Sequence, residues 1–165
     1  MKLIFVLGGA RSGKSRHAEE LLMRAPAPWA YVATAEAFDD EMRERIARHR
    51  ARRDDRWQTL DVPLELADAV AGRQGPALID CLTLWLSNVM LAGRDVEAEA
   101  GRLLATLAAA QGPLIMVSNE VGLGLVPETP LGRAFRDAQG RLNQQVAAGA
   151  DRVIFMAAGL PLVLK

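Results

Sequence analysis

The sequence has little of several residue types on which whole classes of protein depend. It contains one cysteine in 165 residues, so it cannot form an internal disulfide or a multi-cysteine zinc site. A single thiol suits a reducing compartment, and we expect a cytoplasmic protein. Tryptophan, tyrosine and phenylalanine together make up 5% of the chain. That scarcity argues against a surface on which many nucleic-acid bases stack.

An excess of charge of one sign and long apolar runs are also missing. Twenty Lys and Arg residues balance twenty Asp and Glu residues, whereas proteins that bind nucleic acid or acidic membranes normally carry a basic excess. No stretch reaches the roughly 18 uncharged apolar residues that a membrane-spanning helix needs. The first apolar run, Leu3–Leu7, is too short for a signal peptide. We therefore expect no nucleic-acid partner and no membrane span.

What the chain does contain is an alternation of short apolar runs with longer amphipathic runs. Half of its residues are hydrophobic and 24% are charged, which is typical of a globular protein, and the length predicts one domain over residues 1–165. The predicted strands are 3–7, 29–33, 77–79, 113–117, 153–157 and 160–164; the predicted helices are 14–24, 38–52, 64–71, 82–91, 96–110 and 131–148. This rhythm predicts an α/β fold with a mostly parallel sheet, whose ligands bind beyond the carboxyl ends of the strands.

The strongest motif is the glycine-rich segment after the first apolar run. It reads Gly8-Gly9-Ala10-Arg11-Ser12-Gly13-Lys14-Ser15 and matches G-x-x-x-x-G-K-[ST] at every fixed position, between a predicted strand and a predicted helix. Its backbone N–H groups and the helix N-terminus are suited to surround a phosphate. Lys14 is expected to reach the outer phosphates and Ser15 to ligate Mg²⁺. The motif implies a nucleoside triphosphate, ATP or GTP; a simple turn between strand and helix is the less favoured alternative.

Asp80, at the end of the predicted strand 77–79, has two interpretations that the pattern leaves about even. It could join the Mg²⁺ shell or contact the nucleotide, or it could cap the helix that begins at Leu82. The N-K-x-D motif of switch-type GTPases is absent, because Glu120 follows Asn119. A regulatory GTPase is therefore disfavoured.

Of the two histidines, His49 is the more informative. In the helix predicted for residues 38–52, the apolar residues Phe38, Met42 and Ile46 recur every four positions, and His49 falls inside the arc of roughly 80° that they span. An imidazole nitrogen can attack phosphorus and form a covalent intermediate. The alternative is a structural histidine at the edge of the core, and the pattern alone favours that alternative by about two to one.

A glycine-spaced loop follows the predicted strand 113–117. Ser118, Asn119 and Glu120 lead into a segment in which Gly122 and Gly124 alternate with apolar residues. Such a loop can approach a ligand closely. The interpretation as a plain connecting loop stays equally open.

Together these segments resemble one family, the bifunctional adenosylcobinamide kinase/adenosylcobinamide-phosphate guanylyltransferases of cobalamin biosynthesis. The resemblance covers nearly the whole chain and implies a P-loop NTPase fold of the RecA-like kind, a mostly parallel sheet with helices on both faces. It is carried by the glycine-rich motif with Arg16, Tyr31-Val32-Ala33-Thr34-Ala35, Asp39-Asp40-Glu41-Met42 with Arg45-Ile46 and His49, Trp57, Ser118-Asn119-Glu120-Val121-Gly122 with Gly124, Val126-Pro127-Glu128, Phe135-Arg136-Asp137, Gly140-Arg141 and Asn143-Gln144.

The resemblance implies two reactions. A nucleoside triphosphate, ATP or GTP, phosphorylates the hydroxyl of the aminopropanol arm of adenosylcobinamide. GTP then transfers GMP to a histidine of the enzyme, and adenosylcobinamide phosphate takes it to give adenosylcobinamide-GDP. The family nucleophile falls on His49, which reverses the odds stated above for that residue. The alternatives are a monofunctional P-loop kinase of another small alcohol and a nucleotide-binding module without turnover.

The resemblance also implies the nucleotide contacts and the assembly. Four segments supply the implied nucleotide contacts: Gly8, Gly9, Ala10, Arg11, Ser12, Gly13, Lys14 and Ser15; Ala33, Thr34 and Ala35; Arg50, Ala51, Arg52 and Arg53; and Asp61 and Asp80. Of these, Ser15 and Asp80 would hold Mg²⁺. The implied catalytic residues are Lys14 and His49. The family usually carries Glu at positions 61 and 80, one methylene longer than Asp. The resemblance also implies a homo-oligomer, specifically a trimer, and the apolar run 82–91 could contribute to the contact between its subunits.

Overall fold

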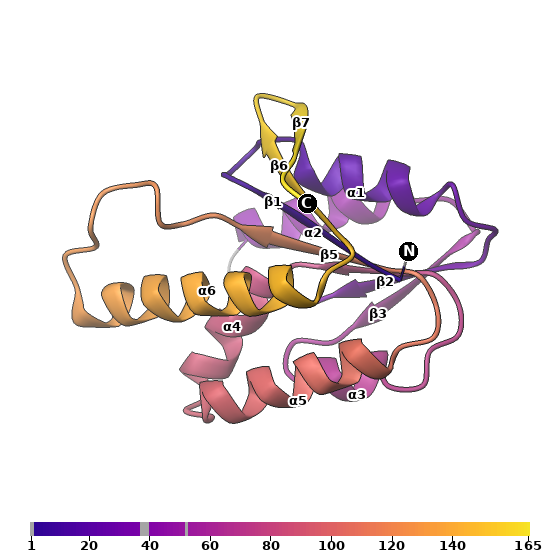
Figure 1. Cartoon of the computed structure of the whole chain (residues 1–165). Helices are drawn as coiled ribbons and strands as arrows, with labels where there is room; N and C mark the ends of the chain where they lie inside the picture. Colours follow the sequence, from indigo (N-terminus) through magenta and orange to yellow (C-terminus); the bar gives the residue numbers. More distant parts are fainter. Residues whose placement is uncertain (1, 37–39, 52) are drawn as a thin grey trace.

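A seven-stranded sheet forms the centre of the computed structural model, which describes residues 2–36, 40–51 and 53–165 (Figure 1). Its strands lie in the order β3-β2-β4-β5-β1-β6-β7. Strands β1 to β6 pair in parallel, and β7 pairs antiparallel with β6. The mostly parallel sheet predicted from the sequence is therefore confirmed. The bounds are β1 Leu3–Gly8, β2 Trp29–Ala33, β3 Trp57–Asp61, β4 Ala77–Asp80, β5 Leu114–Asn119, β6 Arg152–Ala157 and β7 Leu160–Val163.

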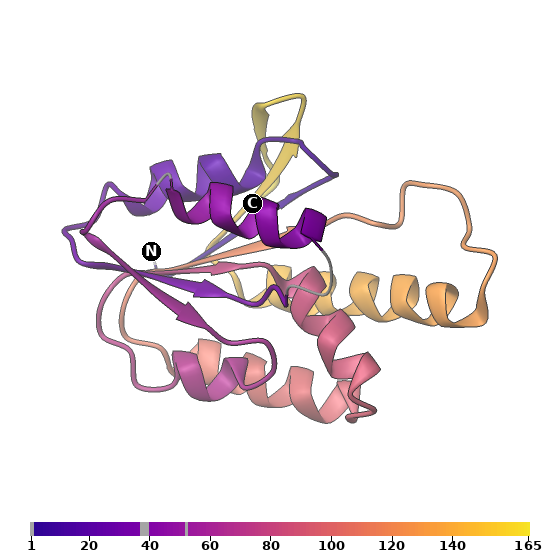
Figure 2. The ribbon, with the colours of Figure 1, turned by 180° about the vertical axis from the view of Figure 1, so that it is seen from behind.

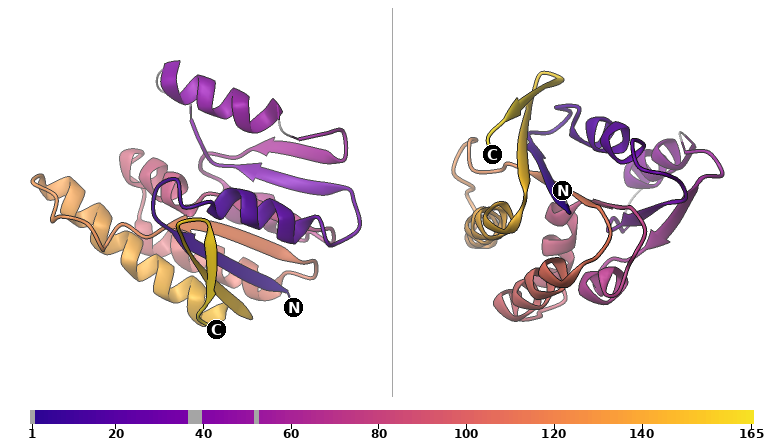
Figure 3. Two further views of the ribbon diagram at one scale, coloured as in Figure 1. Left: turned by 90° about the horizontal axis from the view of Figure 1, so that it is seen from above. Right: turned by 45° about the vertical axis from the view of Figure 1, so that its right-hand side comes forward.

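Helices cover both faces of this sheet, which confirms the predicted layering. Helix α1 packs on one face through Ala18 and Leu22, and α2 lies on the same side (Figures 2 and 3). Helices α3 to α6 cover the other face, where Trp85, Leu103 and Leu142 are buried. The bounds are α1 Lys14–Leu22, α2 Asp40–Ala51, α3 Leu66–Val70, α4 Leu82–Leu91, α5 Val96–Ala109 and α6 Pro130–Gly149. None of the helices in the described ranges is long and apolar enough to cross a membrane.

Strand β5 shows why the apolar runs become central strands. Successive side chains of a strand point to opposite faces, so Leu114 and Met116 join the core under α3 to α6 while Ile115 and Val117 join the core under α1. A strand covered on both faces must be apolar at every position, which is the continuous pattern seen in the sequence.

The strand order gathers the predicted site residues at one edge. Because β5 lies between β1 and β4, the parallel register places Gly8 beside Asn119, and Asp80 beside Val117. Ala33 pairs with Asp80 on one side and with Asp61 on the other. All five strand ends are carboxyl ends, where α/β folds bind their ligands.

One strand departs from the sequence predictions. Strand β3 was not predicted; it is an edge strand whose exposed Gln58 and Thr59 interrupt the apolar pattern. The expectation that the run 82–91 contributes surface to a second subunit stays a prediction: most of α4 packs into the core of one chain, while Leu91 at its end is exposed. Leu82, Leu86 and Val89 are fully buried within that core.

Candidate functional site

The glycine-rich motif forms the loop between β1 and α1. Gly13 adopts a left-handed conformation with φ 91° immediately before Lys14, the first residue of α1. Arg11 also has a positive φ, of 55°. The Nζ of Lys14 donates a hydrogen bond to the carbonyl oxygen of Gly9 at 3.1 Å, which places the ammonium group against the loop. The loop therefore brings together a helix N-terminus, glycine-rich backbone and a cation, the combination that binds phosphate.

The loop is packed so closely that its first position requires glycine. A Cβ on Gly8 would lie 2.5 Å from Ser12 Oγ and 2.7 Å from the carbonyl oxygen of Met156. The turn between β6 and β7 braces the loop from outside, because Gly159 N donates to the carbonyl oxygen of Ser12 at 3.0 Å. Ser12 Oγ is buried, and no described residue gives it a hydrogen-bond partner. An unpartnered hydroxyl inside the loop fits a phosphate oxygen as its missing partner.

Asp80 ends β4, and Tyr31 orients its carboxylate. The Tyr31 hydroxyl donates to Asp80 Oδ2 at 2.8 Å. Burial, followed by the negative charge of Asp80, raises the pKa of Tyr31 far above its usual value, so the phenol remains a donor. The residue that caps α4 is Cys81, without a side-chain capping bond. The interpretation of Asp80 as the helix cap is therefore wrong.

Arg53 lies over the ring of Tyr31 and extends this row of polar groups. Its guanidinium carbon is 3.5 Å from the ring centroid. Within the described part of the chain, the buried Nε and Nη1 of Arg53 have no hydrogen-bond partner. Guanidinium groups form their strongest hydrogen bonds with carboxylates and phosphates. Arg53 is therefore suited to the nucleotide contact predicted for it.

Two other predicted contacts, Arg50 and Asp61, bind each other. Arg50 Nη2 donates to both carboxylate oxygens of Asp61 at 2.6 Å, and both side chains remain about half exposed. Exposed ion pairs contribute little stability, so a phosphate or a ribose hydroxyl could replace either partner. The neighbouring Ala51 ends α2 and is exposed, whereas Arg52 lies outside the described residues.

Thr34 supports the end of β4 from within the core. Its hydroxyl donates to the carbonyl oxygen of Cys81 at 2.7 Å and accepts from Cys81 N at 2.9 Å. Its carbonyl oxygen accepts from Asn88 Nδ2 at 2.9 Å. Ala33 ends β2, and Ala35 follows in a half-buried position. Direct contact of these three residues with a nucleotide stays a prediction.

His49 lies in the last turn of α2, so the predicted helix is confirmed over Asp40–Ala51. Phe38 and the side chains of Met42, Ile46 and His49 lie outside the described part of the structure, and the apolar arc that would contain the imidazole stays a prediction. Helix α2 and the glycine-rich loop with α1 lie on the same side of the sheet (Figure 2).

A buried cluster of amides and hydroxyls lies under the end of β5, where the sequence predicted no support. Ser118 Oγ donates to Asn143 Oδ1 at 2.8 Å and accepts from Gln139 Nε2 at 3.0 Å. The peptide of Asn119 is held on both sides. Its N–H donates to Thr83 Oγ1 at 2.8 Å, and its carbonyl oxygen accepts from Asn143 Nδ2 at 3.1 Å. The residue that adjoins Gly8 is thereby fixed by α4 and α6.

The donor set is compatible with the Mg²⁺ that accompanies a nucleoside triphosphate. Within residues 2–36, 40–51 and 53–165, no three His, Cys, Asp or Glu side chains form a metal-binding group. Mg²⁺ bound to a nucleotide needs no such cage, because it takes one or two protein oxygens together with phosphate and water. Ser15, in the first turn of α1, and Asp80 supply oxygens of this kind.

The chain is similar to proteins of known activity along nearly its whole length. Residues 4–164 match the family model CobU, cobinamide kinase / cobinamide phosphate guanyltransferase. The bifunctional adenosylcobalamin biosynthesis protein CobP of Pseudomonas aeruginosa is 48% identical over 167 residues, which cover 97% of this chain and 95% of that protein. The protein CobU of Salmonella typhimurium is 36% identical over 181 residues and covers 99% of each chain.

A solved structure shares the fold at much lower identity. The prototypical ATPase from the type III secretion system of pathogenic bacteria superposes with a TM-score of 0.55 at 13% identity. The match covers 98% of this chain, which spans 56% of the ATPase chain. The likeness concerns the fold alone, and it agrees with the predicted α/β fold with a mostly parallel sheet.

Proposed function

The chain belongs to the cobinamide kinase / cobinamide phosphate guanyltransferase family, and from that premise we propose which of its residues carry out the two reactions. It is a bifunctional transferase of adenosylcobalamin biosynthesis, and its substrates are a corrinoid and nucleoside triphosphates. The observation that carries our residue assignment is the braced glycine-rich loop with Lys14, placed at the same sheet edge as Asp80 and Asn119.

We assign phosphoryl transfer to this loop. Its backbone N–H groups hold the phosphates, and the Lys14 ammonium faces the oxygens on which charge accumulates as the γ-phosphoryl group leaves. The cobinamide hydroxyl oxygen attacks the γ-phosphorus, the bond to the β-phosphate oxygen breaks so that the nucleoside diphosphate leaves with its electrons, and the hydroxyl proton passes to water. Ser15 and Asp80 would hold Mg²⁺, which when bound neutralises charge on the phosphates. Tyr31 keeps Asp80 in place for that role.

We assign GMP transfer to His49. The neutral imidazole attacks the α-phosphorus of GTP, an N–P bond forms, and pyrophosphate leaves with the electrons of the broken P–O bond. A phosphate oxygen of cobinamide phosphate then attacks the same phosphorus, the N–P bond breaks, and free imidazole returns. Arg53, with two buried nitrogens that lack partners among the described residues, would bind the phosphate oxygens.

A labelling experiment tests this assignment. GTP labelled at the α-phosphate should leave protein-bound label that survives base and is lost in acid, as a phosphoramidate is. His49→Ala should abolish the label and reduce GMP transfer by several orders of magnitude, while cobinamide phosphorylation remains measurable. His17→Ala, which changes the other histidine, should keep the label. Label that persists in His49→Ala contradicts the proposal, as does a joint loss of both activities with nucleotide affinity intact.

Two further proposals concern assembly and location. We propose a homo-oligomer because the outer strand β7 presents exposed apolar side chains, among them Leu160 and Leu162; that it is a trimer is what the family resemblance implies. We propose a cytoplasmic location because the only cysteine, Cys81, is a free thiol.

A further inference from the structure

The loop between β5 and α6, residues 120–129, starts next to Gly8 and exposes large apolar side chains. Leu123 is 82% exposed and Leu125 is 96% exposed, and the neighbouring Val126 is also exposed. We propose that this segment, which we name the acceptor loop, binds the apolar face of the corrin ring of the acceptor, and that Arg133 and Arg136 are positioning residues that hold the loop in shape. This inference rests on the proposed function, which supplies a corrinoid acceptor.

The first residues of the acceptor loop lie next to the glycine-rich loop. Asn119 pairs with Gly8 in the sheet, and Glu120 N donates to the carbonyl oxygen of Gly8 at 3.2 Å. The peptide of Asn119 is clamped by Thr83 and Asn143, as described above. A molecule bound along the acceptor loop therefore lies beside the place where the phosphates of the nucleotide are expected.

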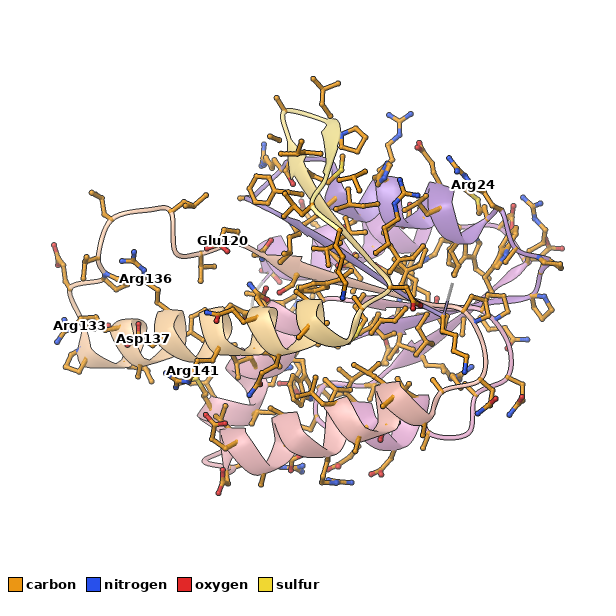
Figure 4. The ribbon with its side chains drawn as sticks, viewed as in Figure 1. Arg24, Glu120, Arg133, Arg136, Asp137 and Arg141 are labelled. Atoms are coloured by element: carbon orange, nitrogen blue, oxygen red, sulfur yellow. The ribbon has the colours of Figure 1, made fainter. Side chains whose placement is uncertain are left out.

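The first part of the acceptor loop is fixed through its backbone. Glu120 Oε1 accepts a hydrogen bond from Gly122 N at 2.5 Å, and Arg136 Nη2 donates to the carbonyl oxygen of Gly122 at 2.5 Å. Figure 4 shows Arg136 between α6 and the loop, with Glu120 at the start of the loop. These contacts use polar groups of the backbone and leave the side chains that follow Gly122 free to project outward.

The returning part is held just as closely. Arg133 Nη1 donates to the carbonyl oxygens of Pro127 at 3.1 Å and Glu128 at 2.7 Å. A Cβ on Gly132 would lie 2.8 Å from Pro127 Cβ, so the loop packs directly on the first turn of α6. Two arginines thus fix a loop whose apolar side chains stay exposed, uncovered by the residues that the structure describes. Fixing apolar groups in water is unfavourable unless a ligand covers them.

The corrin ring is the occupant that these features favour. The groups expected to contact the phosphates, among them Lys14, Arg53 and Asp80, are polar or charged and offer no surface for the apolar face of a macrocycle. The acceptor loop supplies that surface next to them and in continuity with β5. A corrin ring seated there would leave its flexible arm, which carries the reacting hydroxyl or phosphate, to reach the nucleotide. Binding at a remote part of the substrate positions the reacting group.

The test separates binding of the corrinoid from binding of the nucleotide. The double variant Leu125→Ser/Val126→Ser should raise the KM for cobinamide and the Kd for the corrinoid, measured by equilibrium dialysis with corrin absorbance, about tenfold or more. The KM for GTP and the GMP label on the protein should stay unchanged. Leu91→Ser, which removes an exposed leucine at the end of α4, is the matched control and should change neither.

The positioning role of Arg136 is tested by a pair of variants. Arg136→Met keeps the apolar stem but loses the donor to Gly122, and should raise the KM for cobinamide with kcat for GMP transfer nearly unchanged. Arg136→Lys restores a donor and should recover most of the affinity. A purely structural role predicts instead a loss of Tm with equal loss for both substrates.

Three outcomes would overturn the inference. They are an unchanged corrinoid Kd in the double variant, an equal loss of corrinoid and GTP affinity, and a change of sedimentation coefficient with corrinoid affinity unchanged, which would make the loop a contact between copies of the chain. A wild-type enzyme without GMP label or kinase activity would instead refute the proposed function, so the two failures are distinguishable.

Discussion

Individual buried polar atoms indicate where a nucleotide would bind more directly than the glycine-rich motif does. Ser12 Oγ and two nitrogens of Arg53 are buried without hydrogen-bond partners among the described residues. Such a group loses roughly 1–3 kcal/mol when nothing replaces its water. Both residues belong to segments for which nucleotide contact is predicted, one inside the glycine-rich loop and one above Tyr31. The arrangement is one that a bound phosphate would complete.

Lys14 is the residue on which both reactions should depend. Lys14→Ala removes the cation held against Gly9, so phosphate charge stays unpaired, and we expect GTP affinity, kinase activity and GMP transfer each to fall about a hundredfold or more. Isothermal titration with GTP and the two activity assays measure this. Lys2→Ala, at an exposed position directly before β1, is the control. Normal GTP turnover in Lys14→Ala would show that the loop does not bind the transferred phosphates.

Cys81 should make the fold sensitive to alkali. Burial, followed by the charge of Asp80, raises the pKa of its thiol from 9.0 to about 11. The folded chain holds this proton more tightly than the unfolded chain, so the stabilisation is complete below pH 9 and is lost as the pH rises through 11. A two-unit shift corresponds to about 2–3 kcal/mol of unfolding free energy.

Urea unfolding from about pH 8 to pH 11 measures that loss. Tyr31, whose pKa is also raised, adds a loss of the same sign in the wild type and in the variant. Cys81→Ala should therefore flatten the alkaline decline without abolishing it. Parallel curves for the wild type and Cys81→Ala would contradict the assignment.

At the scale of elements, the buried segments were predicted best. The run 29–33 coincides with β2, and the run 82–91 with α4, because most of their side chains are apolar and buried in the core. Strand β3 escaped prediction because it lies at the sheet edge, and its Gln58 and Thr59 face water. An edge strand needs few apolar residues, so its pattern resembles that of a loop.

The buried cluster under β5 escaped prediction for a different reason. Gln139 and Asn143 are four residues apart on α6, on the face that also carries Leu142 and Val146 into the core. Two amide side chains on an otherwise apolar helix face are the sequence signal that indicates a buried polar cluster. Their partner Ser118 is contributed by a distant segment, and no spacing in the sequence identifies a tertiary partner.

The glycine-rich loop offers a test of close packing within one element. At Gly8 an added Cβ would meet Ser12 Oγ and the carbonyl oxygen of Met156, whereas at Gly9 it would meet no atom within 4 Å. We expect Gly8→Ala to lower the free energy of unfolding by about 1–3 kcal/mol and to weaken GTP binding, because the loop must shift. Gly9→Ala should leave Tm unchanged in the absence of nucleotide. Equal Tm values for the two variants would show that the loop is looser than its contacts indicate.

At the scale of the whole molecule, the strand order decides which residues become neighbours. The motifs themselves were readable, but the placement of β5 between β1 and β4 was not, because it depends on tertiary packing. That placement brings Asn119 beside Gly8 and sets the start of the acceptor loop next to the glycine-rich loop. The corrinoid surface therefore had no signature in the sequence beyond a glycine-spaced loop.

The hairpin of β6 and β7 lies on the other side of β1 from β5 and the acceptor loop. Strand β7 is the last of the sheet, and its Leu160, Leu162 and Val163 are exposed. An apolar strand at the edge of a sheet is a template for pairing with another chain. The turn of this hairpin also holds Ser12 through Gly159. A contact between subunits on β7 would therefore influence the position of the glycine-rich loop.

The double variant Leu160→Lys/Leu162→Lys should dissociate the oligomer, because the subunit contact would lose two apolar side chains and would have to bury two charges in their place. Analytical ultracentrifugation should show the mass of a trimer for the wild type and of a monomer for the variant. Since the hairpin turn holds Ser12, GTP affinity should fall along with the mass. Leu125→Lys, in the acceptor loop, should leave the mass unchanged. A wild-type chain that sediments as a monomer at every concentration would contradict the proposed trimer, and a variant of unchanged mass would exclude β7 as its contact.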